Sequence, residues 1–325
     1  MLRGLGSLLL TLLCAAAQNA PDSFRANHER GEASIRKGDM NAAVPWLRRA
    51  YAIDPGNYEN AWDLATACVE TKRLQEARQI VEALLKRGDR SELHNLLGEI
   101  EESEGHGLEA IRQFEAAARS DPTEKNVFDL GAALLNTTGV QQAVQVLEFG
   151  VGKYAGSARL RVALGIAYYS LSRYPEAVET LCQAVDLNPR DTRALEFLGK
   201  MRDVAPELAP EVKRRLGRFA ELYPENAGAN YYYALSLVDA NDEAAAEARL
   251  LKSVSLDPSF AEAHYQLGVL YQKHNQATKA VRELEAAVKL RSDLKAAHYR
   301  LSTLYRAQGL AEKARRELEI FRSLP

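Results

Sequence analysis

Cysteine is scarce in this chain, with three residues in 325, and this scarcity excludes a small protein whose fold depends on disulfide bonds. No charge of one sign is in large excess, because 42 Lys and Arg stand against 44 Asp and Glu, for a formal net charge of -2. This balance gives no overall attraction to nucleic acid or to an anionic membrane surface. Hydrophobic residues at 46% and charged residues at 26% are instead typical of a folded chain with a core.

An apolar run opens the chain. Arg3 precedes the apolar stretch Leu5 to Cys14, and three alanines follow it at 15–17. This order of positive, apolar and small residues is typical of a secretory signal peptide, and the stretch is shorter than the roughly 20 residues that span a membrane. We expect cleavage after Ala17 and export to the periplasm or the medium. Two alternatives stay open, an uncleaved N-terminal anchor and a lipid anchor on Cys14.

Behind this segment the sequence repeats with a period of about 34 residues. Alanines recur with this spacing, as from Ala280 to Ala314, and a second row of small residues that contains Gly165 has the same period. After the predicted signal peptide at 1–17 and a short lead at 18–23, the repeats fill residues 24–325. Their nine starting residues are Phe24, Tyr58, Ser91, Glu124, Ala158, Thr192, Ala227, Ala261 and Lys295.

Each repeat has the pattern of two amphipathic helices joined by tight turns. In the repeat that starts at Ala261, Leu267 and Tyr271 share one face of the first helix, and Leu284 and Ala287 share one face of the second. Glycine or asparagine follows the first helix, where a left-handed residue ends it. These residues are Gly38, Gly105, Gly139, Asn241, Asn275 and Gly309.

The spacing of Gly165, Tyr168, Ala177, Leu181 and Ala184 resembles the tetratricopeptide repeat, and the pattern recurs through the whole repeat region. The resemblance implies an all-α fold, a right-handed superhelical solenoid of about nine helix-turn-helix units. It also implies that the first helices line a concave groove, and that this groove binds an extended peptide or a helix of another protein.

Repeat six departs from the pattern. Pro206 and Pro210 fall in or beside its turn, and one extra residue shifts Leu216 and Phe219. Proline restricts the residue before it and lacks a backbone N–H, so it interrupts a helix. We therefore expect a local kink or a longer turn in this repeat.

Aromatic residues recur at the fifth position of the repeats, which the resemblance places on the concave side. Tyr231, Tyr265 and Tyr299 are spaced by 34 residues, which predicts a ladder of stacked rings. Trp62 and Phe128 hold the same position in earlier repeats. These side chains can bind a partner or pack against the neighbouring repeat, and the sequence leaves both interpretations open.

Charge is divided along the chain. Residues 24–157 contain 16 Lys and Arg and 21 Asp and Glu, whereas residues 158–325 contain 25 and 22. In the acidic third repeat, Glu92, Glu99 and Glu102 are expected toward the inner face. They indicate either a solvated charged helix or an acidic groove that steers a basic segment of a partner.

No catalytic, cofactor-binding or metal-binding site is predicted. Cys68 and Cys182 lie three repeats apart, and helix packing at about 10 Å a layer separates them beyond disulfide distance. His264 and His298 are 34 residues apart and can face each other across adjacent repeats, but two histidines alone are a weak metal signal. No glycine-rich loop is followed by Lys and Ser or Thr, as phosphate binding requires.

We therefore predict a non-enzymatic, exported scaffold that binds other proteins and not nucleic acid, and that meets a membrane only through its N-terminus. The alternative is a self-associating structural component of an envelope. It rests on the last helix, where no later repeat covers the apolar residues, so that this end favours a homo-oligomer. Those residues are Leu310, Ala314, Leu318, Ile320 and Phe321.

Overall fold

A computed structural model describes residues 23–137 and 139–325. Within these ranges the chain forms eighteen α-helices and one 3₁₀ turn, with no strand. The prediction of an all-α fold built from helical hairpins is confirmed. The predicted signal peptide, residues 1–17, lies outside the described residues.

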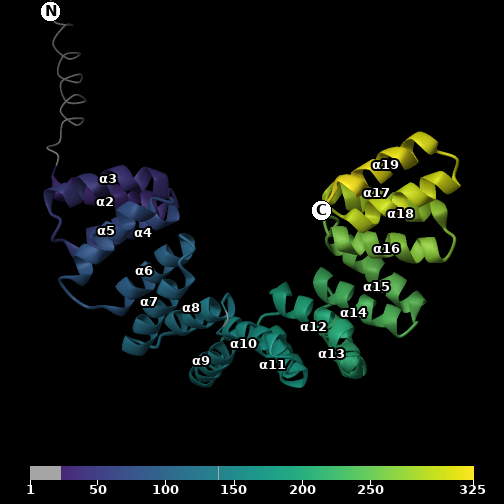
Figure 1. The fold of residues 1–325 in the computed structure, drawn as a ribbon, viewed down its shortest axis with the longest axis horizontal. Helices are drawn as coiled ribbons and strands as arrows, with labels where there is room; N and C mark the ends of the chain where they lie inside the picture. Colours follow the sequence, from purple (N-terminus) through teal and green to yellow (C-terminus); the bar gives the residue numbers. More distant parts are fainter. Residues whose placement is uncertain (1–22, 138) are drawn as a thin grey trace, which may run out of the picture. The chain divides into compact units, whose positions relative to one another are not determined.

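The chain divides into two compact units, and the boundary falls between Gly150 and Val151. Within unit 1, successive helix pairs stack side by side (Figure 1). The last helix that begins in this unit, α9, continues three residues past the boundary. The helices are α2 (Phe24–Arg36), α3 (Met40–Ile53), α4 (Tyr58–Glu70), α5 (Leu74–Leu85), α6 (Ser91–Ser103), α7 (Gly107–Ser120), α8 (Glu124–Leu135) and α9 (Val140–Lys153).

Unit 2 contains five further helix pairs, stacked in the same way (Figure 1). Its core gathers apolar residues from successive pairs, as repeat proteins do. The helices are α10 (Ala158–Ser170), α11 (Tyr174–Leu187), α12 (Thr192–Val204), α13 (Ala209–Leu222), α14 (Ala227–Asp239), α15 (Glu243–Leu256), α16 (Ala261–Lys273), α17 (Ala277–Leu290), α18 (Lys295–Ala307) and α19 (Ala311–Ser323).

The two helices of a regular pair approach closely where a small residue faces a leucine. A Cβ atom added at Gly31 would lie 2.4 Å from Leu47 Cδ2, and one added at Gly165 would lie 2.6 Å from Leu181 Cγ. Both leucines are fully buried, so they have little freedom to move away. The small residues of the repeating row therefore set the distance between the paired helices.

The first helix of most repeats ends at a residue with positive φ. Five of the six predicted Gly and Asn residues adopt this conformation. Lys72 and Ser172 also have φ of 60° and 58°, which costs a side chain about 1 kcal/mol. The turn geometry is thus imposed by the packing of the helices even where the residue type does not favour it.

Repeat six contains the longer turn expected from its prolines. The 3₁₀ turn Pro206–Leu208 separates α12 from α13. The small residue Gly199 of this repeat faces a ring from the next repeat, because an added Cβ would lie 2.7 Å from Tyr232 Cδ1. Gly31 and Gly165 each face a leucine of their own repeat, whereas Gly199 of repeat six faces an aromatic side chain of repeat seven.

Candidate functional site

The predicted tyrosine row contains three different environments. Tyr231 is only 7% exposed, and burial raises its pKa to about 12. Tyr265 is half-buried, and Tyr299 is 50% exposed. Burial therefore assigns Tyr231 a packing role and leaves the ring of Tyr299 accessible to a partner.

The three tyrosines do not form a ladder. Tyr231 contacts Tyr232 and Phe260, with ring centroids 4.9 and 4.7 Å apart, and Tyr299 contacts Phe321 at 5.3 Å. No ring contact among the described residues joins two members of the row. The helix-packing distance of about 8–10 Å exceeds the 4.5–7 Å at which aromatic rings interact, so equivalent rings of successive repeats find other neighbours.

The two earlier aromatic candidates belong to unit 1. Trp62 is half-buried and packs against the core of this unit, and Phe128 is also half-buried. Neither presents a fully exposed ring, so both contribute at least in part to packing.

Glu92 of the third repeat is engaged by neighbours from two directions. The Tyr58 hydroxyl donates to its carboxylate at 2.9 Å, and Arg90 lies 3.6 Å away. Burial would raise the pKa of Glu92, but the hydrogen bonds from its own backbone N–H and from Tyr58, together with the charge of Arg90, lower it. Glu92 is thus an ionised carboxylate that is already partly compensated.

The other two predicted acidic residues also have partners within unit 1. Lys125 Nζ lies 2.6 Å from Glu99 and 2.8 Å from Asp129, and Asn136 donates to Glu102 at 3.3 Å. Burial would lower the pKa of Lys125, but the hydrogen bonds to Asp129 and Glu99 outweigh it and raise the pKa. These contacts weaken the attraction that the three carboxylates would otherwise exert on a basic partner.

A less compensated acidic cluster lies in the first two repeats. Ligand atoms of His28, Glu32 and Glu59 lie within 4.8 Å of one another, a spacing that a divalent cation can bridge. Burial raises the pKa of the neighbouring Asp63; the charge of His28 opposes this rise, and the charges of Glu32 and Glu59 add to it. Glu32 also lies 3.5 Å from Arg36. The sequence did not reveal this cluster because its members come from two repeats.

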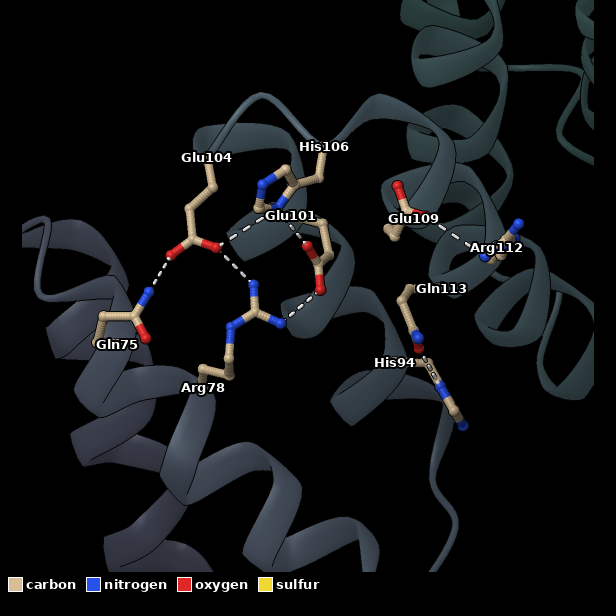
Figure 2. A network of polar contacts seen from close by, with 9 residues as sticks. All are labelled: Gln75, Arg78, His94, Glu101, Glu104, His106, Glu109, Arg112 and Gln113. Atoms are coloured by element: carbon tan, nitrogen blue, oxygen red, sulfur yellow. Dashed lines mark hydrogen bonds and ion pairs between the residues drawn. The ribbon is translucent and has the colours of Figure 1, made fainter.

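A second group with metal-like spacing is already filled by an arginine, as Figure 2 shows. Arg78 of α5 lies 2.5 Å from both Glu101 and Glu104, and His106 Nδ1 lies 2.9 Å from Glu101. The hydrogen bond from Arg78 lowers the pKa of Glu101, although burial opposes this shift. The guanidinium takes the place of a metal ion here and joins the second repeat to the third.

The two cysteines and two histidines singled out in the sequence lie among the described residues. Cys68 and Cys182 are buried free thiols, and burial raises the pKa of each to about 12, so both are protonated at neutral pH. Both ring nitrogens of His264 and of His298 are engaged by residues of their own repeats or of the turn before them. Each histidine contacts a glutamate of its own repeat, at 2.8 Å for Glu283 and 2.6 Å for Glu317.

An accessible polar and aromatic surface lies on the last two repeats. We call it the α16–α18 surface and define it by Tyr265 and Gln272 of α16 and Tyr299 and Arg300 of α18. The Arg300 side chain donates from Nε to Tyr265 Oη at 3.3 Å and from Nη1 to Gln272 Oε1 at 2.9 Å. These bonds fix the relative positions of side chains from two successive first helices.

Unit 2 also has an open pocket of about 680 Å³ at the turns that lead into its first helices. Gly228 is part of its lining, and a Cβ atom added there would lie 3.3 Å from Thr192 Cγ2. The apolar part of the lining suits an aliphatic or aromatic side chain. It is formed by Pro189, Pro224, Tyr232 and Phe260.

The last helix, α19, shows a mixture of covered and open apolar residues. Ala314 is buried, and Leu318, Ile320 and Phe321 are half-buried, the last against the Tyr299 ring. Leu310 is 42% exposed. Self-association through this end stays a prediction.

Within the described residues, no helix is both long enough and apolar enough to cross a bilayer.

Sequence models of the tetratricopeptide repeat match residues 34–100, 128–192, 162–209 and 250–282, which together make up more than half of the chain. The chain belongs to the tetratricopeptide repeat family. No curated protein matches it in sequence.

Solved tetratricopeptide repeat structures share the fold. The C-terminal part of a repeat protein from Cytophaga hutchinsonii is 17% identical, with a TM-score of 0.53 over 86% of this chain and 99% of that one. A tetratricopeptide repeat protein from Parabacteroides merdae is 15% identical, with a TM-score of 0.52 over 86% and 98%. PilF from Pseudomonas aeruginosa is 18% identical, with a TM-score of 0.50 over 62% and 92%. These likenesses concern the fold alone.

Proposed function

We propose that this tetratricopeptide repeat protein is an exported, non-enzymatic scaffold that binds a segment of a partner protein on the α16–α18 surface. The observation that carries the proposal is the exposed ring of Tyr299 beside the hydrogen-bonded Tyr265 and Arg300. Tyrosine and arginine are enriched where proteins bind one another, because both combine a large contact area with a polar group.

The partner segment is extended or helical, and the open pocket of unit 2 adds an apolar contact for it. The proposal is supported by the repeat architecture, since stacked helical hairpins present side chains of successive first helices along one direction. A segment that follows this direction meets equivalent positions of neighbouring repeats. Export is supported by the sequence of residues 1–17, with its positive, apolar and small residues in order.

Selection from a displayed library of random 12-residue peptides tests binding. We expect enriched sequences, and we expect the variant Tyr265→Ala/Tyr299→Ala to bind the enriched peptides at least about 10-fold more weakly, in the range of interface hot spots. The matched control is Phe149→Ala, which removes a ring of similar exposure from unit 1. A library without enrichment, or an equal loss in the control, contradicts the proposal.

The N-terminus of the chain recovered from the exported fraction tests localisation. We expect it to begin at Gln18, after loss of the predicted signal peptide. Recovery of the intact chain from the membrane indicates the uncleaved anchor, and a lipid on Cys14 as the first residue indicates the lipid anchor. Recovery only from the cytoplasm contradicts export.

A further inference from the structure

Arg300 of α18 is held by two hydrogen-bond partners from α16, and both are neutral. They are the Tyr265 hydroxyl and the Gln272 amide oxygen. Across the described part of the chain, no carboxylate lies within ion-pair distance of Arg300. Arg291, another arginine of the last three repeats, is instead paired with Glu262.

The environment of Arg300 also restricts its motion. The side chain is half-buried, and its guanidinium carbon lies 6.0 Å from the centre of the Tyr265 ring. Two of the five guanidinium N–H groups are used by Tyr265 and Gln272, and the other three, on Nη1 and Nη2, have no acceptor among the described residues. A cation held in this way has already lost much of the side-chain entropy that binding would otherwise cost.

The unused donors of this surface suit an anion. The Tyr265 oxygen accepts from Arg300 and keeps its own O–H group, for which no acceptor is present in the described residues. The one carboxylate at the start of α16, Glu262, is neutralised by Arg291. The α16–α18 surface is therefore a set of donors with a positive charge and an adjacent aromatic ring, and no described carboxylate is paired with Arg300.

We propose that the α16–α18 surface selects partner segments with an acidic side chain, an Asp or Glu whose carboxylate is held by Arg300 and Tyr265 while an adjacent residue contacts the Tyr299 ring. This inference rests on the proposed function and gives it a chemical class of partner. A guanidinium binds a carboxylate through two parallel hydrogen bonds, which an uncharged amide cannot reproduce.

The same displayed library tests the selectivity, provided that the random peptides are fused at their C-termini. This fusion removes free terminal carboxylates, so any acidic preference comes from side chains. We expect Asp or Glu at one enriched position with the wild-type chain and no such preference with Arg300→Gln. For a synthetic enriched peptide, we expect Glu→Gln in the peptide and Arg300→Gln in the protein each to weaken binding at least about 10-fold.

Two further variants serve as controls. Arg300→Lys keeps the charge but not the paired hydrogen bonds, so we expect it to restore part of the affinity. Arg316→Gln removes an exposed cation from α19 and is expected to leave the affinity unchanged within about twofold. Unchanged thermal unfolding of Arg300→Gln shows that the loss of affinity is not a loss of fold.

The outcomes separate this inference from the proposed function. Enrichment without an acidic position, or an acidic preference that survives in Arg300→Gln, overturns the inference and leaves peptide binding intact. A library without any enrichment overturns both.

Discussion

The two units are built from the same helical hairpin, and both contain ion pairs between repeats, as Arg215 and Glu179 show in unit 2. The third repeat and the last two repeats nevertheless differ in how their charged side chains are engaged. In the third repeat, which belongs to unit 1, carboxylates of the first helix are engaged by neighbouring side chains, as Glu99 is by Lys125 and Glu101 by Arg78. In unit 2, the last two repeats leave the Tyr299 ring exposed and surround Arg300 with neutral partners. The charges of the third repeat thus join it to its neighbours, whereas the charge of Arg300 remains available to another molecule.

The largest expected effect concerns the tyrosines within unit 2. Tyr231→Ala removes a buried ring and is expected to cost about 3–5 kcal/mol of unfolding free energy. Tyr299→Ala is expected to cost less than about 1 kcal/mol, because half of that side chain is already exposed. Denaturant unfolding of the two variants checks this ranking, and equal losses would remove the distinction between packing and accessible tyrosines.

The next effect concerns the charges that join repeats in unit 1. Arg78→Met leaves Glu101 and Glu104 without their common cation and is expected to cost about 3 kcal/mol at neutral pH. The matched control, Arg112→Met, breaks an exposed pair with Glu109 and is expected to cost less than about 1 kcal/mol. Equal losses in these variants would contradict the joining role.

The pH dependence of this pair follows from the lowered pKa of Glu101. A carboxylate whose pKa is lower in the folded state stabilises the fold above its ordinary value, about 4.3, and loses that contribution as the pH falls through the folded value. The penalty of Arg78→Met is therefore expected to shrink toward about pH 3. Unfolding midpoints measured across this range check it, and a constant penalty would contradict it.

A smaller effect should be shared by the two units. Gly31→Ala in unit 1 and Gly165→Ala in unit 2 each place a Cβ against a fully buried leucine and are expected to cost about 1–3 kcal/mol. Gly152→Ala is the control, since nothing lies near its added Cβ, and a helical alanine is expected to stabilise it slightly. Thermal unfolding measures the three variants, and a melting temperature that falls as far in the control as in the other two would argue against close helix packing.

The smallest effect lies in the turns. Lys72→Gly and Ser172→Gly, one in each unit, remove the backbone strain of a side-chain-bearing residue at positive φ. Each is expected to stabilise the chain by about 0.5–1 kcal/mol. Calorimetry of the two variants measures the gain. A loss at both positions would show that these side chains contribute contacts that outweigh the backbone strain.

The repeat fold was predictable because its determinants recur. One small residue per repeat, such as Gly165, and one apolar face per helix are visible at a fixed spacing, and the close contact of Gly165 with Leu181 follows from them. Lys72 and Ser172 were not predictable as left-handed residues, since the packing of the helices imposes that conformation and their own type does not reveal it.

The candidate site was only partly predictable. Spacing identified Tyr265 and Tyr299 but treated Tyr231 as their equivalent, because spacing does not report burial. Arg300 was missed, since its hydrogen bonds to Tyr265 and Gln272 of the preceding repeat are visible only in three dimensions. The pairing of Glu99 with Lys125 crosses from one repeat to the next and was hidden for the same reason.

Hydrogen exchange of the whole chain, with and without an enriched acidic peptide, tests the central claim most directly. The account predicts slower amide exchange in α16 and α18 on binding, no change in α4 and α6, and loss of the effect in Arg300→Gln. Protection confined to the first helices of unit 1, or to the second helices α17 and α19, would contradict it.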